Sequence, residues 1–185
     1  MPAVATAELT LPERAILASS ASAAYLDHFS DVDRLLVGAF QQQPIQLRRR
    51  TYYSRGQACT IQWQDSGQPL PAWFDPAMQG FADLLTLAPN WNSYRAAAID
   101  RKVIHDAMNF INIILAPTSP APRVVPLSSG GLQLEWHRNG IDLEVIFDVG
   151  EQPLFYFQNH VSGEESEHTL PENSPLLASM IASLE

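Results

Sequence analysis

The sequence predicts an α+β fold, in which an antiparallel β-meander of four or more strands is packed on one face by helices. Residues 130–148 alternate apolar and polar side chains around an Asn-Gly turn, and residues 123–127 and 154–158 continue the strand pattern. Residues 75–115 contain two stretches with helical spacing of apolar side chains. We therefore expect a core domain at 71–185, to which residues 1–70 add a region of helices and a small hairpin.

The N-terminal region begins with small and polar residues, and we expect 1–10 to be disordered. Two helices are predicted next, at about 11–24 and 31–42. Ser30 is the expected N-cap of the second helix, whose first turn carries acidic residues that favour a helix N-terminus.

A smaller hairpin is predicted at 46–53 and 57–64, with a break at Ser54-Arg55-Gly56. It carries the main basic cluster of the chain, which comprises Arg48, Arg49, Arg50 and Arg55. Arginine interleaved with aromatic residues can bind nucleic acid, and here Tyr52 and Tyr53 supply the aromatic rings. The simpler interpretation is that these arginines pair, within one chain or between chains, with the acidic C-terminal third at 131–185. The turn-rich segment 65–72 then gives the best internal boundary.

The first helix of the core is expected to begin with Asp75 as N-cap and to end before Pro89. A second helix is expected at about 98–115, with His105 on its polar side. The loop between the two helices contains Trp91 and Tyr94. These two rings are predicted to pack as a plug between helices and sheet, and the alternative is an aromatic platform for a ligand.

The hairpin at 130–148 has a register that the sequence itself defines. Asn139-Gly140 favours a two-residue type I′ turn, because both positions need a positive φ. The opposed pairs are then Arg138–Ile141, His137–Asp142, Trp136–Leu143, Glu135–Glu144 and Leu134–Val145. The predicted core-facing residues are Leu132, Leu134, Trp136, Ile141, Leu143, Val145 and Phe147.

The opposite face of this hairpin gathers Glu135, His137, Asp142 and Glu144. Asp142 is expected to raise the pKa of His137, whereas the two glutamates repel each other as direct cross-strand neighbours. The plainest interpretation is a solvated sheet face, on which Arg138 or water eases the repulsion. The two functional interpretations are a surface that binds a basic partner and a divalent metal site.

Charge is distributed unevenly along the chain, whose net charge is −9. The acidic and basic residues of segment 1–130 balance, so the whole excess lies in 131–185, where Arg138 is the sole lysine or arginine. Glu164 and Glu165 belong to an acidic loop or hairpin turn between His160 and His168. Such a field repels nucleic acid and favours basic partners, although solubility alone would also explain it.

Several classes of protein are excluded by absent signals. No apolar run is long enough to span a membrane, and the N-terminus lacks a secretory signal, so we expect a cytoplasmic protein. The single cysteine, Cys59, rules out an internal disulfide and a cysteine-based zinc site. Nucleotide-binding, hydrolase and zinc-protease motifs are missing, and we expect no cofactor.

Two segments together resemble a group of small, uncharacterised bacterial proteins that are frequent in cyanobacteria and actinobacteria. The segments are LAPNWNSY at 87–94 and GGLQLEWH at 130–137, joined by a helix and the strand PRVVP and followed by DLEV. The pattern of the group is LPxNWDSYGA, a helix, PxVVP and GGxQLEWHxxGxDLEVE, and the match covers about residues 80–160. This chain departs from it at Asn92 and Arg95. The resemblance implies a small stand-alone bacterial protein, sometimes in mobile or defence-like gene neighbourhoods, and supplies no site.

The function predicted first is a non-enzymatic interaction protein of antitoxin, immunity or defence and counter-defence type. It would dock its acidic surface on a protein partner with a basic surface. The expected contact residues are Glu135, His137, Asp142, Glu144, Glu164 and Glu165. The alternatives are a metal-dependent enzyme that uses the first four of these residues and a nucleic-acid-binding module that uses the arginine cluster. The sequence leaves open whether the chain forms a homo-oligomer.

Overall fold

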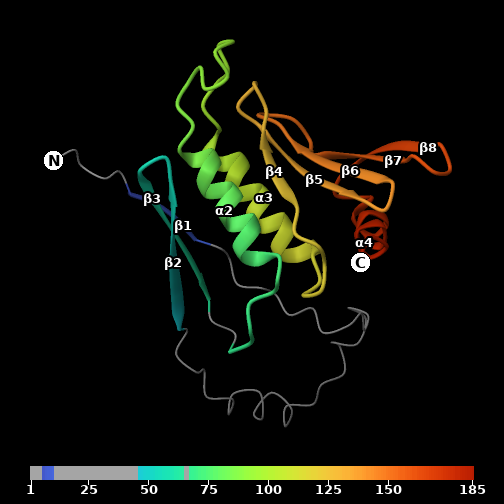
Figure 1. Ribbon diagram of the computed structural model, residues 1–185, viewed down its shortest axis with the longest axis horizontal. Helices are drawn as coiled ribbons and strands as arrows, with labels where there is room; N and C mark the ends of the chain where they lie inside the picture. Colours follow the sequence, from blue (N-terminus) through green and yellow to red (C-terminus); the bar gives the residue numbers. More distant parts are fainter. Residues whose placement is uncertain (1–5, 11–45, 65–66) are drawn as a thin grey trace, which may run out of the picture.

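Two β-sheets enclose a layer of helices in the computed structural model, which describes residues 6–10, 46–64 and 67–185 (Figure 1). The small sheet has the strand order β1-β3-β2, with β1 at Thr6–Thr10, β2 at Leu47–Ser54 and β3 at Gln57–Gln64. The large sheet has the order β4-β5-β6-β7-β8, with β4 at Arg123–Pro126, β5 at Leu132–Arg138, β6 at Ile141–Phe147, β7 at Leu154–Asn159 and β8 at Glu164–Thr169. The described helices are α2 at Phe74–Leu85, α3 at Arg101–Ile114 and α4 at Ser174–Ala182.

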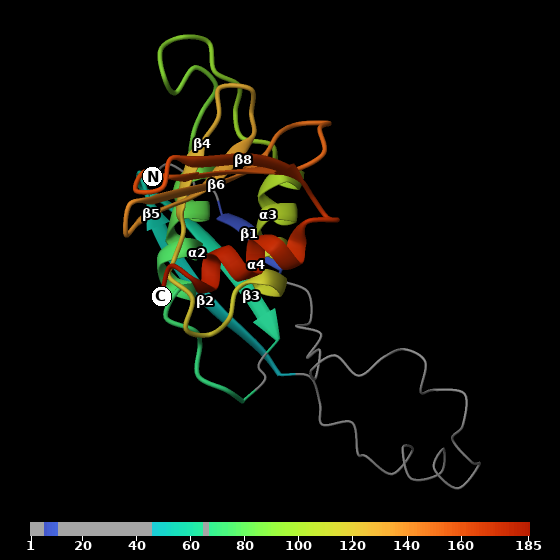
Figure 2. The same ribbon diagram turned by 90° about the vertical axis from the view of Figure 1, so that its right-hand side faces the viewer.

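The predicted α+β class is confirmed. Every neighbouring pair of strands in the large sheet is antiparallel, so β4 to β8 form one continuous meander. Helices α2 and α3 lie between the two sheets in Figure 1, and α3 and α4 lie beneath the large sheet in Figure 2. One face of the large sheet is therefore covered by helices, and the other is turned away from them.

The central hairpin has the predicted register. Glu135 is opposite Glu144 and Trp136 is opposite Leu143, because Asn139 and Gly140 both adopt the positive φ angles of the expected turn. The apolar side chains that were predicted to face the core are buried against the helices, except that Ile141 is only partly covered at the end of its strand. A shift of one residue would place the charged side chains in this core, which is why the register is well defined.

Two tryptophans hold the segment that links α3 to β4. Trp73, at the start of α2, donates its indole N–H to the carbonyl of Ala116 at 2.9 Å. Trp136, from the large sheet, donates to the carbonyl of Pro120 at 2.9 Å. Buried indoles need such a partner, and here two layers of the fold tie down the same proline-rich linker.

The helix boundaries differ from those predicted. The N-cap of α2 is Trp73 rather than Asp75, and α3 begins at Arg101 with Asp100 capping the backbone N–H of Lys102. Asp75 lies in the first turn of α2, where its carboxylate accepts hydrogen bonds from Arg50 and from the hydroxyl of Tyr52. A tertiary contact with the small sheet has thus replaced the local capping role of Asp75.

The small sheet contains the predicted hairpin and one strand that was not predicted. Residues Thr6–Thr10 pair in parallel with β3 instead of being disordered. This segment satisfies backbone groups of β3 that would otherwise form an open sheet edge. The helices predicted at 11–24 and 31–42 lie outside the described residues.

The contact between α2 and the small sheet gives a test of stability in acid. Burial acts to raise the pKa of Asp75, but the hydrogen bonds from Arg50 and Tyr52 prevail and hold it below its usual value of 3.8. A carboxyl with a lowered folded-state pKa stabilises the fold above its unfolded pKa, and this contribution is lost as the pH falls through the folded pKa.

We expect Asp75→Asn to lower the free energy of unfolding at pH 7 by about 1 kcal/mol or less, because the lost ion pair with Arg50 is half exposed. The difference from the wild type should shrink at pH 3. Urea denaturation at the two pH values measures it, and Glu172→Gln, at an exposed turn position, is a control that should match the wild type. A difference that does not depend on pH would contradict the role of the carboxylate.

Candidate functional site

The candidate site is the outer face of the large sheet, which we define as the face turned away from the helices. Strand register places most of its polar side chains in two rows that cross the strands. The first row consists of Arg123, Glu135, Glu144, Tyr156 and Glu167. The second row consists of His137, Asp142, Gln158 and Glu165. The four residues predicted from the hairpin therefore lie together on this face.

A carboxylate held by two imidazoles forms the centre of the second row. His137 Nδ1 lies 2.7 Å from one carboxylate oxygen of Asp142. His160 Nε2 lies 2.7 Å from the other oxygen. The second ring nitrogen of His137, Nε2, is 3.3 Å from Glu135 Oε2. His137 is thus held at both nitrogens, so its ring has a defined orientation.

These contacts shift the pKa values of both partners. The hydrogen bond to Asp142 raises the pKa of His137 most strongly; burial opposes this shift, and Glu135 adds to it. Hydrogen bonds from His137 and His160 lower the pKa of Asp142. The two shifts have opposite directions and both favour the imidazolium–carboxylate pair, as the sequence predicts.

The repulsion between Glu135 and Glu144 is eased from within the outer face. The Glu135 side chain is only 12% exposed. Its Oε1 accepts a hydrogen bond from Gln133 Nε2 at 2.8 Å, and its Oε2 lies 4.0 Å from the guanidinium of Arg123. Arg138, which was expected to ease the repulsion, pairs with Ile141 and so belongs to the opposite side of the sheet.

Tyr156 connects the pair of glutamates to the edge of the sheet. It pairs with Glu144 on one side and with Glu167 on the other. A hydrogen bond with Glu165, together with loss of water and the nearby carboxylates, raises the pKa of Tyr156 to about 12. The phenol hydroxyl is therefore the donor in the hydrogen bond with the carboxylate of Glu165.

The acidic segment after β7 is a fifth strand, β8, rather than a loop. Its register places Glu165 on the outer face, opposite Gln158. Glu164 pairs with Asn159, so it belongs to the helix-facing side of the sheet. Alternation along a strand thus separates two neighbouring residues that were expected to act together.

Sequence reasoning did not assign Arg123, Tyr156, His160 or Glu167 to the outer face, and Glu167 joins it by pairing with Tyr156. Arg123 and Tyr156 reach the site through strand pairing, and His160 reaches Asp142 from the turn after β7. Tyr156 could have been found from the sequence. Once β7 is paired with β6, the alternation of side chains along β7 places Tyr156 opposite Glu144 on the outer face. His160 had been grouped with His168, whose ring instead packs 5.1 Å from that of Phe155, a buried residue on the helix-facing side.

The two aromatic residues predicted in the loop between α2 and α3 differ in burial. Trp91 is partly buried against the core and donates its indole N–H to the carbonyl of Ala97 at 3.1 Å. Tyr94 is 87% exposed, so it takes no part in the predicted plug. The side chain of Asn92 shapes the loop by accepting backbone N–H groups of Tyr94 and Ala96. The two rings therefore do not form the predicted plug together, and the alternative of an aromatic platform for a ligand stays a prediction.

The arginine cluster is also divided. Arg48 and Arg50 alternate with Arg49, so they share the side of β2 that carries the buried Tyr52. Arg50 binds Asp75, whereas Arg49 donates to the side-chain oxygen of Gln62 at 2.8 Å. Arg55 lies in the turn that follows β2. Arg48 and Arg50 therefore face one side of the small sheet and Arg49 faces the other.

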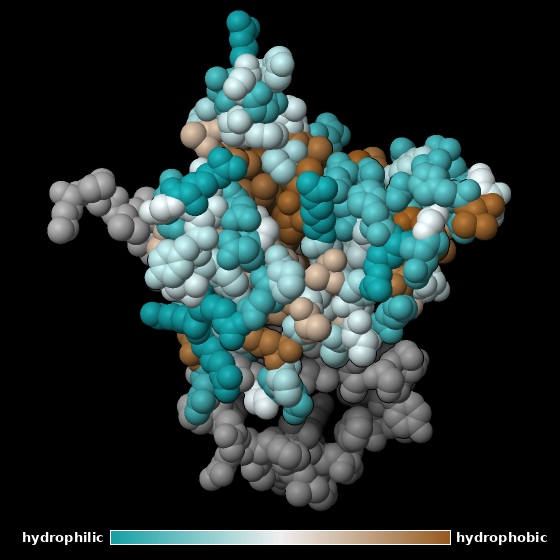
Figure 3. Space-filling model, viewed as in Figure 1, coloured by the Kyte–Doolittle hydropathy of each residue, from teal (hydrophilic) through white to brown (hydrophobic). Residues whose placement is uncertain are grey.

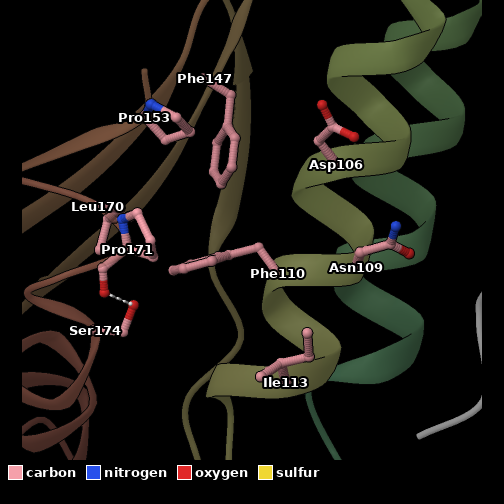
Figure 4. A pocket seen from close by; sticks show the side chains of 9 residues that line it. All are labelled: Asp106, Asn109, Phe110, Ile113, Phe147, Pro153, Leu170, Pro171 and Ser174. Atoms are coloured by element: carbon pink, nitrogen blue, oxygen red, sulfur yellow. Dashed lines mark hydrogen bonds between the residues drawn. The ribbon is translucent and has the colours of Figure 1, made fainter.

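An apolar groove of about 340 Å³ lies on the other side of the large sheet (Figure 4). It is lined by Asp106, Asn109, Phe110, Ile113, Phe147, Pro153, Leu170, Pro171 and Ser174. None of the polar residues of the outer face lines it.

In the view of Figure 3, hydrophilic residues cover much of both sheets, and hydrophobic residues show mainly between them.

One group on the outer face has the composition of a metal site. Glu135, His137 and Glu144 each offer a ligand atom, and these three atoms lie within 4.8 Å of one another. Two oxygens and one imidazole nitrogen are donors that divalent metal ions accept in proteins.

No protein-family model, curated protein or solved structure matches this chain. The resemblance to small bacterial proteins therefore stays a prediction. Among the helices in the described part of the chain, none is both long and apolar enough to cross a lipid bilayer.

Proposed function

We propose that this chain is a non-enzymatic interaction protein that docks the outer face of its large sheet against a basic surface of a partner protein. The observation that supports this most directly is the register of β4 to β8. It collects carboxylates from three strands, β5, β6 and β8, on one side of a rigid sheet. The docking residues would be Glu135, His137, Asp142, Glu144, Glu165 and Glu167.

Charge supports the same proposal. The acidic excess of the chain lies entirely in residues 131–185, which include four of the five strands of this sheet. The register places one arginine, Arg123, on the outer face, and it lies at the β4 edge. A face on which one sign of charge predominates accelerates encounter with an oppositely charged surface and disfavours partners of the same sign.

The biological setting that fits such docking is that of an antitoxin, an immunity protein or an accessory subunit of a bacterial defence or counter-defence system. In each case, an acidic face that covers a basic surface of a toxin or enzyme would block or position it. Nucleic acid is a weaker candidate, because phosphates are repelled by the outer face and the arginines of the small sheet point to different sides.

The test is a double charge reversal, Glu135→Lys with Glu144→Lys, applied to affinity capture from a lysate of the native host. We expect capture of the partner at low salt to fall at least tenfold, because the partner would now meet cations. Raising the salt concentration should weaken wild-type capture and have less effect on the variant. EDTA throughout the assay keeps metal ions from contributing.

The matched control is Glu151→Lys with Glu172→Lys, which changes net charge equally at two exposed turns off the outer face. This control should retain most of the capture. Thermal unfolding of all proteins verifies that the variants fold. Equal losses in both double variants would show that net charge, rather than this face, attracts the partner, and the proposal would then fail.

A further inference from the structure

We propose that Glu135, His137 and Glu144 form a binding site for one first-row divalent transition-metal ion, for which Zn²⁺ is the probe. This site goes beyond the docking proposed above and does not depend on it. The inference rests on the placement of three donor atoms and on the residues that orient them.

The donor atoms are close enough for a single ion. A tetrahedral Zn²⁺ with ligand bonds of about 2.0–2.2 Å separates its donors by about 3.3–3.6 Å. The three candidate atoms already lie within 4.8 Å of one another. Small side-chain rotations would therefore complete the protein's share of the shell, and water would occupy the remaining position.

Strand pairing brings the three donor residues together on one face before any ion is bound. Glu135 and Glu144 are direct cross-strand neighbours, and His137 follows Glu135 by two residues on the same face of β5. The residues between and opposite them, Trp136 and Leu143, are buried in the core and fix the two strands. A site built on paired strands with a packed core beneath has little freedom to lose on binding.

His137 is oriented as a metal ligand requires. Histidines that bind metals generally donate one ring N–H to a carboxylate, which leaves the other nitrogen for the ion. Here Asp142 engages Nδ1 at 2.7 Å, and His160 holds the far oxygen of Asp142 at 2.7 Å. The remaining nitrogen, Nε2, faces Glu135 Oε2 at 3.3 Å, on the side where the ion would lie.

The electrostatics of the site favour a cation. Two carboxylates are paired across the strands, and Glu135 is largely shielded from water. The nearest guanidinium, that of Arg123, is 4.0 Å away and its side chain is mostly exposed, so it neutralises Glu135 only weakly. The imidazole nitrogen in the donor set favours ions such as Zn²⁺ over Mg²⁺ and Ca²⁺, which prefer oxygen ligands alone.

The test is isothermal titration calorimetry of the full, tag-free chain with Zn²⁺ alone. We expect one ion per chain, and we expect Glu144→Gln and His137→Ala each to weaken binding at least tenfold. Asp142→Asn leaves all three ligands in place and should weaken binding about 10- to 100-fold by releasing the orientation of His137. Mg²⁺ at the same concentration should bind much more weakly.

The matched controls are Glu165→Gln and Glu167→Gln, which each remove one charge from the same face outside the donor set. Both should bind Zn²⁺ as the wild type does. Absence of Zn²⁺ binding by the wild type would overturn the inference, as would equal weakening in the controls or equal affinity for Mg²⁺. Because partner capture is measured in EDTA, failure of the metal site leaves the docking proposal standing, and failure of docking leaves the metal site standing.

Discussion

Replacing Trp136 with alanine is expected to lower the free energy of unfolding by about 3–5 kcal/mol. Trp136 is 2% exposed and is one of the largest fully buried side chains in the described core. Its removal would open a cavity beneath the outer face and leave the Pro120 carbonyl without the indole N–H that it accepts at 2.9 Å. Because a domain of this kind is typically stable by about 5–15 kcal/mol, the loss is a large part of the whole.

Chemical denaturation of Trp136→Ala followed by circular dichroism measures this effect. Trp136→Phe is the matched control, since it keeps an aromatic ring in the core and removes mainly the hydrogen bond. It should cost clearly less than the alanine variant. If both variants cost under about 1 kcal/mol, Trp136 would contribute far less to stability than its burial in the core indicates.

Gly131→Ala is expected to destabilise the chain by about 3 kcal/mol, because the new methyl group has no space. A Cβ at this position would lie 2.5 Å from the backbone oxygen of Phe147 and 3.0 Å from Cα of Asp148. Both atoms belong to the backbone at the end of β6, so relief requires β5 and β6 to move apart. The loss of stability in Gly131→Ala therefore reports on the pairing of β5 with β6, the hairpin that carries the candidate site.

The control for this clash is Gly163→Ala. Gly163 has a φ of +77°, and no atom lies within 4 Å of the point where a Cβ would be added, so alanine there meets only backbone strain of about 1–2 kcal/mol. Urea denaturation should therefore rank Gly131→Ala as more damaging than Gly163→Ala. The reverse order would contradict the close approach at Gly131.

Local signals were enough to predict the central hairpin. Asn139-Gly140 defines the turn, and strict alternation on both sides leaves one register that buries Leu134 and Val145 together. The grouping of Glu135 with Glu144 and of His137 with Asp142 followed from that register alone. Each of these inferences involves residues close in sequence, where the pattern itself carries the geometry.

Other parts of the candidate site depended on contacts between distant segments. His160 lies eighteen residues after Asp142, and no turn motif relates the two directly. Arg123 meets Glu135 only because β4 pairs with β5 at that register. The split of Glu164 from Glu165 required knowledge that their segment is a strand paired with β7.

Local propensity was overruled at the helix starts as well. Asp75 is a good N-cap by type, yet its carboxylate instead binds Tyr52 and Arg50 of the small sheet. The strand at Thr6–Thr10 likewise depends on the edge of β3, which lies about fifty residues further along the chain. Propensity describes a segment by itself, whereas these outcomes depend on which surface that segment meets.

By itself, the sequence determined the α+β class, the register of the hairpin and the concentration of acidic residues in the last third of the chain. The tertiary structure decided which acids of β8 join the outer face, that His160 reaches Asp142, and where the arginines point. The physical reason is that alternation and turn chemistry act over a few residues. Strand order and sheet edges are decided by burial of apolar surface and by backbone hydrogen bonding across the whole chain.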